Sequence, residues 1–292
     1  MPRHIDIVGH RGARGLFPEN TLEGFRAAFD LGVRRFELDV GLTADGVPVV
    51  THDLRLNPAI ARDPAGPWLN GPGPAIHALT SAELRGFDVG RIRPATAYNL
   101  LFRHQKGQDG LRVPTLDAVL RALPDASFIV ELKTDPRHPD LTADPIHMAE
   151  ATLATIDAAG ATGRVVVESF DWRGPRHIAR TRPDIPLAWL TSEETVGNAA
   201  LWWDGETPVR YGSSIPAAVA AQSPATIWAP AHATLTHRLV AESHDLAVRV
   251  LPWTVNRRLA MRRLIRWGVD GLITDRPDIA MRVVGEGRAP SH

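Results

Sequence analysis

Cysteine is absent from this chain of 292 residues, and so is any excess of charge, because 33 basic residues balance 33 acidic ones. Without cysteine, neither a disulfide scaffold nor a thiolate metal site can form. Proteins that bind nucleic acid present a strongly basic surface, and this composition does not supply one. We therefore expect no nucleic-acid partner.

Long apolar runs are also missing, and none approaches the roughly 18 residues of a membrane span. The N-terminal stretch "MPRHIDIVGHRG" lacks the apolar segment and cleavage site of a signal peptide. We expect no integral membrane segment. The chain as written predicts a cytoplasmic protein, or a periplasmic or secreted one if the sequence is a mature form; its oligomeric state is left open.

Short β-rich runs alternate with amphipathic stretches, which predicts a mostly parallel sheet covered by helices. About eight strands over some 250 residues are typical of a (β/α)8 TIM barrel. An open, doubly wound sheet is the alternative, but no Gly-rich dinucleotide fingerprint follows the first run. The runs are 5–9, 34–40, 47–51, 127–133, 164–169, 186–191, 226–230, 247–255 and 271–274.

Nine runs are one too many for such a barrel. Only "GLTADG" separates the run 47–51 from its predecessor, so it is either a hairpin partner or a misread strand. In the first amphipathic stretch, "NTLEGFRAAFDLG", Asn20 is expected to cap a helix with Glu23 three residues on, and Gly32 to end it.

Residues 54–113 interrupt the alternation. This segment is dense in proline and glycine and shows no long periodic helix. Long irregular segments inside compact domains are usually functional insertions. We therefore expect one domain, 1–292, with an inserted subdomain at about 54–113 that walls the mouth of the barrel; a solvated excursion without contact to the chemistry is the alternative.

Polar residues gather at the ends of the predicted strands, where barrel enzymes build their sites. Glu37 and Asp39 share one face of a strand, because side chains repeat every two residues, and Glu131 shares a face of another strand with Lys133. Three carboxylates in one barrel mouth repel one another unless a positive charge lies between them. A hard divalent cation with oxygen ligands, Mg²⁺ or Ca²⁺, meets that need.

Further candidates follow other strands. His10 and His52 offer a general acid and a general base, and Arg11 and Lys133 offer positive charge for a phosphate. Taken singly, each has a structural explanation. Asp275, in front of Arg-Pro, is interpreted as a helix cap rather than a ligand.

The motifs "HRGARGLFPENT", "ELDVGLTADGVPVVTHD", "VELK", "PWTVN" and "GVDGLITDRP" closely resemble the glycerophosphodiester phosphodiesterase family. The resemblance runs from His10 to Pro277 with the motifs in family order. It implies a (β/α)8 barrel that hydrolyses a glycerophosphodiester to sn-glycerol 3-phosphate and an alcohol. It also implies one divalent cation, Mg²⁺ or Ca²⁺, and attack by the substrate's own 2-hydroxyl.

Motif position also implies residue roles. The resemblance implies that Glu37, Asp39 and Glu131 are metal ligands and that His10 and His52 are the acid and the base. It also implies that Arg11 and Lys133 bind the phosphate and that Trp253 lines the glycerol pocket. Glu168 departs from the family, because many relatives carry Gln or Ser there. A carboxylate at this position could add a metal ligand, bind a cationic head group or pair with an arginine.

Two other functions remain open. A lysophospholipase D or sphingomyelinase D-like lyase on the same fold needs an apolar lip for acyl chains, which Trp68, Trp202 and Trp203 could supply. A noncatalytic phosphate-binding barrel predicts the loss of at least one histidine or carboxylate from these motifs, and none is lost.

Overall fold

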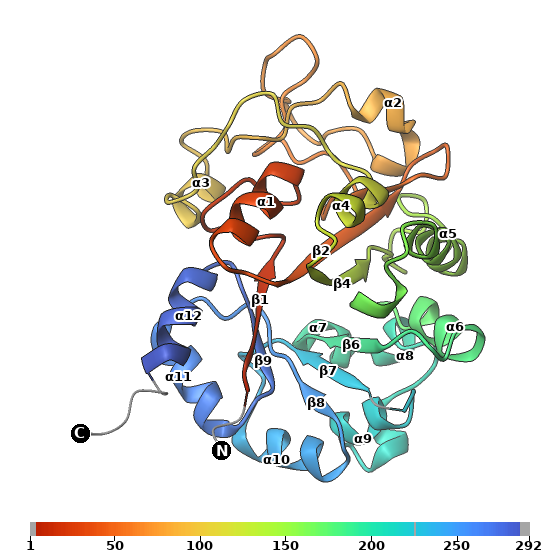
Figure 1. Cartoon of the computed structure of the whole chain (residues 1–292). Coiled ribbons are helices and arrows are strands. Elements are labelled where there is room, and N and C mark those ends of the chain that lie inside the picture. Colours follow the sequence, from red (N-terminus) through yellow and green to blue (C-terminus); the bar gives the residue numbers. More distant parts are fainter. Residues whose placement is uncertain (1–3, 225, 287–292) are drawn as a thin grey trace.

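The computed structural model describes residues 4–224 and 226–286, and in these ranges eight parallel strands form a nearly closed barrel (Figure 1). The order around the barrel is β8-β7-β6-β5-β4-β2-β1-β9. The strands are β1 (Asp6–His10), β2 (Arg35–Leu42), β4 (Ser127–Leu132), β5 (Val165–Ser169), β6 (Leu187–Thr191), β7 (Ile227–Pro230), β8 (Arg249–Val250) and β9 (Gly271–Thr274). The predicted (β/α)8 TIM barrel is confirmed.

The barrel closes where the chain after β8 meets β9. The Ile273 amide donates to the Pro252 carbonyl at 3.0 Å, and the Val255 amide donates to the Ile273 carbonyl at 2.9 Å. Regular strand structure nevertheless stops at Val250, although the predicted run continued to residue 255. Pro252 has no N–H to donate, which interrupts a regular ladder.

Helices surround the strands, and their apolar faces pack on the outside of the barrel. The longer ones are α1 (Leu22–Asp30), α4 (Leu116–Ala122), α5 (Pro145–Ala158), α6 (Arg173–Thr181), α9 (Ile215–Ala220), α10 (His237–Asp245), α11 (Arg258–Trp267) and α12 (Pro277–Glu286). Shorter elements are α7 (Glu193–Gly197), α8 (Ala199–Trp202), η2 (Thr162–Arg164) and η3 (Pro208–Tyr211). Within the described ranges, no helix is long and apolar enough to cross a bilayer.

The run 47–51 contains a hairpin partner. Strand β3 (Pro48–Val50) pairs antiparallel with β2, with Val50 opposite Val40, and it takes no place in the parallel ring. The hairpin therefore returns the chain to the carboxyl end of β2, where His52 follows β3.

Helix α1 begins one residue later than predicted. Thr21 is its N-cap, and the Thr21 hydroxyl accepts a hydrogen bond from the Gly24 amide at 3.0 Å. Asn20 lies outside the helix in the left-handed region, with φ 52°, and its amide donates to Asp39 at 2.9 Å. The expected cap at Asn20 is therefore wrong, because its side chain serves the barrel mouth instead.

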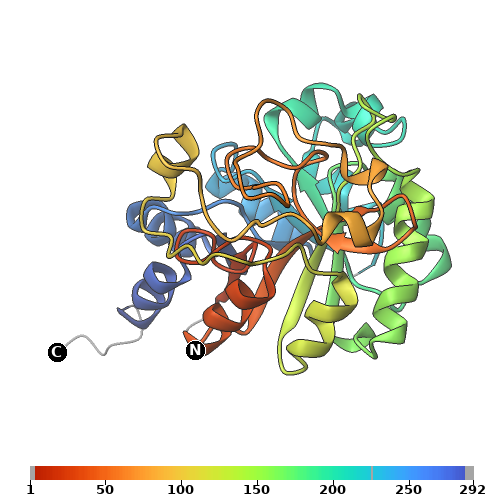
Figure 2. The same ribbon diagram turned by 90° about the horizontal axis from the view of Figure 1, so that it is seen from above.

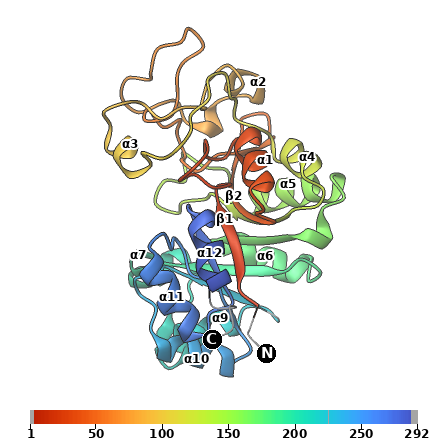
Figure 3. The same cartoon turned by 60° about the vertical axis from the view of Figure 1, so that its left-hand side comes forward.

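Residues 54–113 are largely irregular, with only the short elements η1 (Ile76–Ala78), α2 (Ser81–Leu84) and α3 (Ala97–Leu101). Figures 1 and 3 show the segment, orange to yellow, beside α1 and β2 and far from α10; it lies in front of the strands in Figure 2. It has its own apolar cluster, which includes Leu56, Ile76 and Leu84. That the segment forms a separate subdomain stays a prediction.

The loop after β1 leaves no room for a side chain at Gly9, near the end of the strand. A Cβ there would lie 2.0 Å from the Gly12 carbonyl oxygen and 3.3 Å from the Phe36 ring. The loop that carries His10 and Arg11 can fold tightly back over β1 only because residue 9 has no side chain.

We expect Gly9→Ala to lower the free energy of unfolding by about 1–3 kcal/mol, because the backbone at Gly12 must move. Gly163→Ala is the control: a Cβ at this exposed position meets nothing within 4 Å, so stability should change by less than about 0.5 kcal/mol. Equilibrium urea unfolding measures both, and equal midpoints for the two variants would contradict the constraint.

Candidate active site

Three carboxylates meet at the mouth of the barrel. Glu37 and Asp39 extend from one face of β2, and strand register places Glu131 of β4 opposite Asp39. All three are buried, and one ligand atom from each lies within 4.8 Å of the other two. Parallel pairing of β2 with β4 therefore assembles the predicted cluster.

The cluster is electrostatically frustrated. Burial, reinforced by the Asp39 charge, raises the pKa of Glu37 well above its usual range. Burial likewise raises the pKa of Glu131 to about 7, although Lys133 opposes the shift. Burial also disfavours ionisation of Asp39, but the charges of His52, Arg11 and Lys133 outweigh it and hold the pKa of Asp39 well below its usual range.

Two oxygens of the cluster have no hydrogen-bond partner among the described residues. They are Glu37 Oε1 and Asp39 Oδ1, both buried. Buried polar atoms are almost always satisfied in native proteins, so a missing partner indicates an ion or ligand. Three carboxylates at this spacing, two of them with an oxygen that lacks a partner, fit a hard divalent cation.

Two cationic side chains border the cluster. Arg11 lies with Nε 3.3 Å from Asp39 Oδ2, and its Nη1 donates to Glu19 at 2.9 Å. Lys133 places Nζ 2.8 Å from Glu131 Oε1 and 3.6 Å from Asp39 Oδ1. The structure thus brings both predicted phosphate ligands to the carboxylates, where they offset part of the negative charge.

Each predicted catalytic histidine is anchored through Nδ1 on a carboxylate. His10 Nδ1 lies 2.6 Å from Asp275 Oδ1, and His52 Nδ1 lies 2.6 Å from Asp53 Oδ1. A carboxylate only accepts, so the proton sits on Nδ1 and leaves Nε2 of each neutral ring free to accept another. Burial lowers the pKa of both, that of His10 to about 4.

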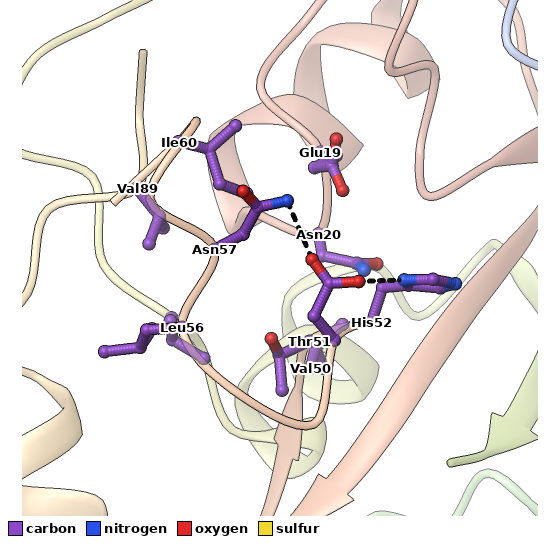
Figure 4. A pocket seen from close by; sticks show the side chains of 11 residues that line it. Glu19, Asn20, Val50, Thr51, His52, Leu56, Asn57, Ile60 and Val89 are labelled. Carbon is purple, nitrogen blue, oxygen red and sulfur yellow. Dashed lines mark hydrogen bonds and ion pairs between the residues drawn. The ribbon is translucent and has the colours of Figure 1, made fainter. Parts of the chain in front are cut away.

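Asp53, which holds His52, is itself held by a residue of the irregular segment 54–113. The Asn57 amide donates to Asp53 Oδ2 at 2.8 Å. Figure 4 shows His52 and Asn57 on two sides of one carboxylate, each joined to it by a dashed hydrogen bond. The segment also reaches the loop after β1, since Tyr98 donates to Glu19. The segment therefore contacts two residues beside the site, Asp53 and Glu19.

Asp275 does not cap α12. Its Oδ1 accepts from His10 and from Arg14 Nε, the latter at 2.8 Å, and its Oδ2 accepts from the Asn256 amide at 2.6 Å. The Thr274 hydroxyl accepts from the Arg276 amide instead. The interpretation of Asp275 as a helix cap is therefore wrong, because the barrel brings β9 beside β1 and His10 within reach.

Two neighbouring cavities share lining residues among these groups. An inner cavity of about 220 Å³ reaches into the barrel, and an outer cavity of about 400 Å³ faces the rim. Both are lined by His52, Glu131, Phe170 and Trp253. The residues that line only the inner cavity are His10, Arg11, Arg14, Glu37, Glu168, Leu190, Thr254 and Ile273. The residues that line only the outer cavity are Asp53, Leu54, Lys133, Thr134, Asp135, Arg137, Ser192, Glu194, Thr195 and Trp202.

Trp253 and Glu168 form part of the cavity walls. The indole of Trp253 donates from Nε1 to the Ala229 carbonyl at 2.9 Å and meets Phe170 edge-on with ring centres 5.4 Å apart. Its orientation is therefore fixed. Glu168 on β5 stands opposite Glu131 in register and is buried.

The proposed tryptophan lip does not form as a unit. Trp203 is fully buried and stacks on Trp172 with ring centres 4.1 Å apart. Trp202 lines the outer cavity, and Trp68 lies in the irregular segment with Arg62 over its ring. The expectation for Trp203 is wrong, because its ring belongs to the core.

Comparisons with known proteins agree with this geometry. The model of the glycerophosphoryl diester phosphodiesterase family matches residues 10–279. The uncharacterized protein YqiK of Bacillus subtilis (strain 168) is 31% identical over 279 residues, covering 94% of this chain and 96% of that protein. A glycerophosphodiester phosphodiesterase from Caldanaerobacter subterraneus is 27% identical over 96% of this chain and 98% of its own.

Solved structures give the same result. A protein from Silicibacter pomeroyi DSS-3, assigned to the glycerophosphoryl diester phosphodiesterases, has a TM-score of 0.89 and 38% identity over 98% of this chain and 95% of its own. An Oleispira antarctica phosphodiesterase in complex with the product sn-glycerol-3-phosphate has a TM-score of 0.71 and 19% identity, with 96% of each chain covered, and shows the shared fold. The chain therefore belongs to the glycerophosphoryl diester phosphodiesterase family.

Proposed function

We propose that this chain is a metal-dependent enzyme that hydrolyses glycerophosphodiesters to sn-glycerol 3-phosphate and an alcohol. One observation carries the proposal: three buried carboxylates meet within 4.8 Å, two of them with an oxygen that lacks a hydrogen-bond partner among the described residues. Two of these carboxylates, Glu37 and Glu131, line the same cavity as His10 and His52. The family membership and the product bound by the Oleispira antarctica relative support the choice of substrate.

Glu37, Asp39 and Glu131 would hold the cation, Mg²⁺ or Ca²⁺. Their oxygens are the ligands that these ions prefer, and two of these oxygens have no hydrogen-bond partner in the part of the chain that the structure describes. When bound, the cation would neutralise charge on the phosphate and lower the pKa of a hydroxyl beside it. Arg11 and Lys133 would hold the phosphate from either side of the cluster, as charge-assisted donors.

The attacking group in this proposal is the 2-hydroxyl of the glycerol unit. Its oxygen forms a bond to phosphorus while the bond to the leaving alcohol breaks, which yields a cyclic phosphate. Water then opens the ring and leaves sn-glycerol 3-phosphate. A hydroxyl held against phosphorus within one molecule has a large advantage over a separate nucleophile.

His10 and His52 would move the protons of both steps. One neutral ring accepts the proton of the attacking hydroxyl on Nε2, and the other ring, which enters the step protonated on both nitrogens, gives its Nε2 proton to the leaving alkoxide. In the second step the two rings exchange roles. The structure suits this exchange, because both rings are fixed in the same way, with Nδ1 on a carboxylate. Asp275 and Asp53 would not contact the substrate; they would orient the rings of His10 and His52 and fix their tautomers.

The lyase alternative has less support than the hydrolase. A lyase of lysophospholipids or sphingolipids needs an apolar lip, and of the three tryptophans considered for it only Trp202 lines the outer cavity. The charged side chains of Asp135, Arg137 and Glu194 also line this cavity. A polar alcohol can solvate these charged groups, whereas an acyl chain cannot.

The nucleophile can be tested with a pair of substrates in the presence of Mg²⁺ or Ca²⁺. Glycerophosphocholine should be cleaved, and its 2-deoxy analogue should react about 10³-fold more slowly or worse, because the intramolecular attack is lost. Steady-state choline release measures both rates, with competition to confirm that the analogue binds. Comparable turnover of the analogue would replace this mechanism with direct attack by water.

Asp275→Asn should lower kcat by about 10²–10⁴-fold with little change in KM, because His10 loses its anchor and its tautomer is no longer fixed. Asp275 raises the pKa of His10, so the limb of the pH profile that reports this ring should also move to lower pH. Asp278→Asn is the matched control, since Asp278 pairs with Arg276 outside both cavities. Equal kcat values for the two variants would rule out the anchoring role.

A further inference from the structure

Glu168 is a buried carboxylate that the proposed reaction does not use. It lies on β5, is 1% exposed and lines the inner cavity. Its Oε2 has no hydrogen-bond partner in the part of the chain that the structure describes. A buried carboxylate oxygen without a partner is costly, so we expect a ligand to supply the missing donor.

The structure narrows the three roles that the sequence left open for Glu168. It is not a member of the carboxylate cluster whose ligand atoms lie within 4.8 Å of one another, so a fourth metal ligand has no geometric support. Within residues 4–224 and 226–286, no arginine forms an ion pair with Glu168. It does not line the outer cavity, which is the wider one and suits variable head groups.

The inner cavity suits the constant part of the substrate. Its volume of about 220 Å³ admits a glycerol unit, and Phe170, Leu190, Trp253 and Ile273 provide apolar walls for the carbon chain. A glycerol unit esterified at one end carries two hydroxyls. The one beside the ester is the proposed nucleophile, and the terminal one needs an acceptor on the protein.

We propose that the Glu168 carboxylate accepts a hydrogen bond from the terminal hydroxyl of the glycerol unit and thereby selects glycerol over related diols. The inference rests on the proposed function, since it assigns a residue to the substrate of the same site. Glu168 is the acceptor, because it combines a free buried oxygen with a place in the inner cavity outside the carboxylate cluster.

The test compares glycerophosphocholine with an analogue that lacks only the terminal hydroxyl and keeps the hydroxyl beside the ester. For the unmodified enzyme, kcat/KM of the analogue should be about 10- to 150-fold lower, which is the cost of leaving a buried acceptor without its partner. In Glu168→Leu the two substrates should differ by less than about 3-fold, because the acceptor is gone. Glu168→Gln keeps an acceptor oxygen and should keep part of the preference.

Two controls separate this role from others. Glu206→Gln changes a buried carboxylate that pairs with Arg210 and Tyr211 and lines neither cavity, so its substrate ratio should equal that of the unmodified enzyme. Cation binding by Glu168→Leu, measured by calorimetry, should be unchanged. An undiminished ratio in Glu168→Leu, or equal losses on both substrates, would overturn the inference.

Binding measurements keep the inference testable if a variant folds poorly or catalysis fails. Calorimetry with the unmodified protein should show sn-glycerol 3-phosphate binding at least about 10-fold more tightly than the analogue without its terminal hydroxyl. Glu168→Gln should narrow that difference. Equal affinities for the two phosphates in the unmodified protein would overturn the inference, whereas failure to cleave either diester contradicts the proposed function instead.

Discussion

Mutual repulsion of Glu37, Asp39 and Glu131 in a buried barrel mouth is the constraint on which the rest of the site depends. Burial and neighbouring negative charge raise the pKa of Glu37 and that of Glu131, which means that ionisation of both side chains is unfavourable. Arg11 and Lys133 offset only part of this cost, because Glu37 Oε1 and Asp39 Oδ1 still lack a hydrogen-bond partner among the described residues. The protein keeps an unfavourable arrangement that a divalent cation would make favourable.

The fold fixes that arrangement from several directions. Register between β2 and β4 sets Asp39 opposite Glu131, and the tight turn at Gly9 brings the Arg11 amide to Glu37 Oε2 at 3.0 Å. The carboxylates that hold the histidines follow β9 and β3, so the His10 anchor depends on the pairing of the first strand, β1, with the last, β9. Stability of the barrel and geometry of the site are therefore linked.

Much of this could be predicted from sequence, because period-two spacing and strand-end position are local properties. They placed Glu37, Asp39 and His10 correctly at one barrel mouth. The role of Asn20 and Asp275 could not be predicted in the same way. Both have a common local function as caps, and only three-dimensional closure shows that Asp39 and His10 lie within their reach. Trp203 was misjudged for the same reason, since burial depends on distant packing partners.

The central claim is that the carboxylate cluster binds a divalent cation, and equilibrium unfolding with and without the ion tests it most directly. Mg²⁺ or Ca²⁺ at 100 times its dissociation constant should raise the free energy of unfolding by about 2.7 kcal/mol. The gain should disappear in Asp39→Asn and with Na⁺ at equal ionic strength. In chelator, Glu37→Gln should be at least as stable as the unmodified protein, because one repulsive charge is removed. Unmodified protein that gains no stability from either divalent ion would contradict the account.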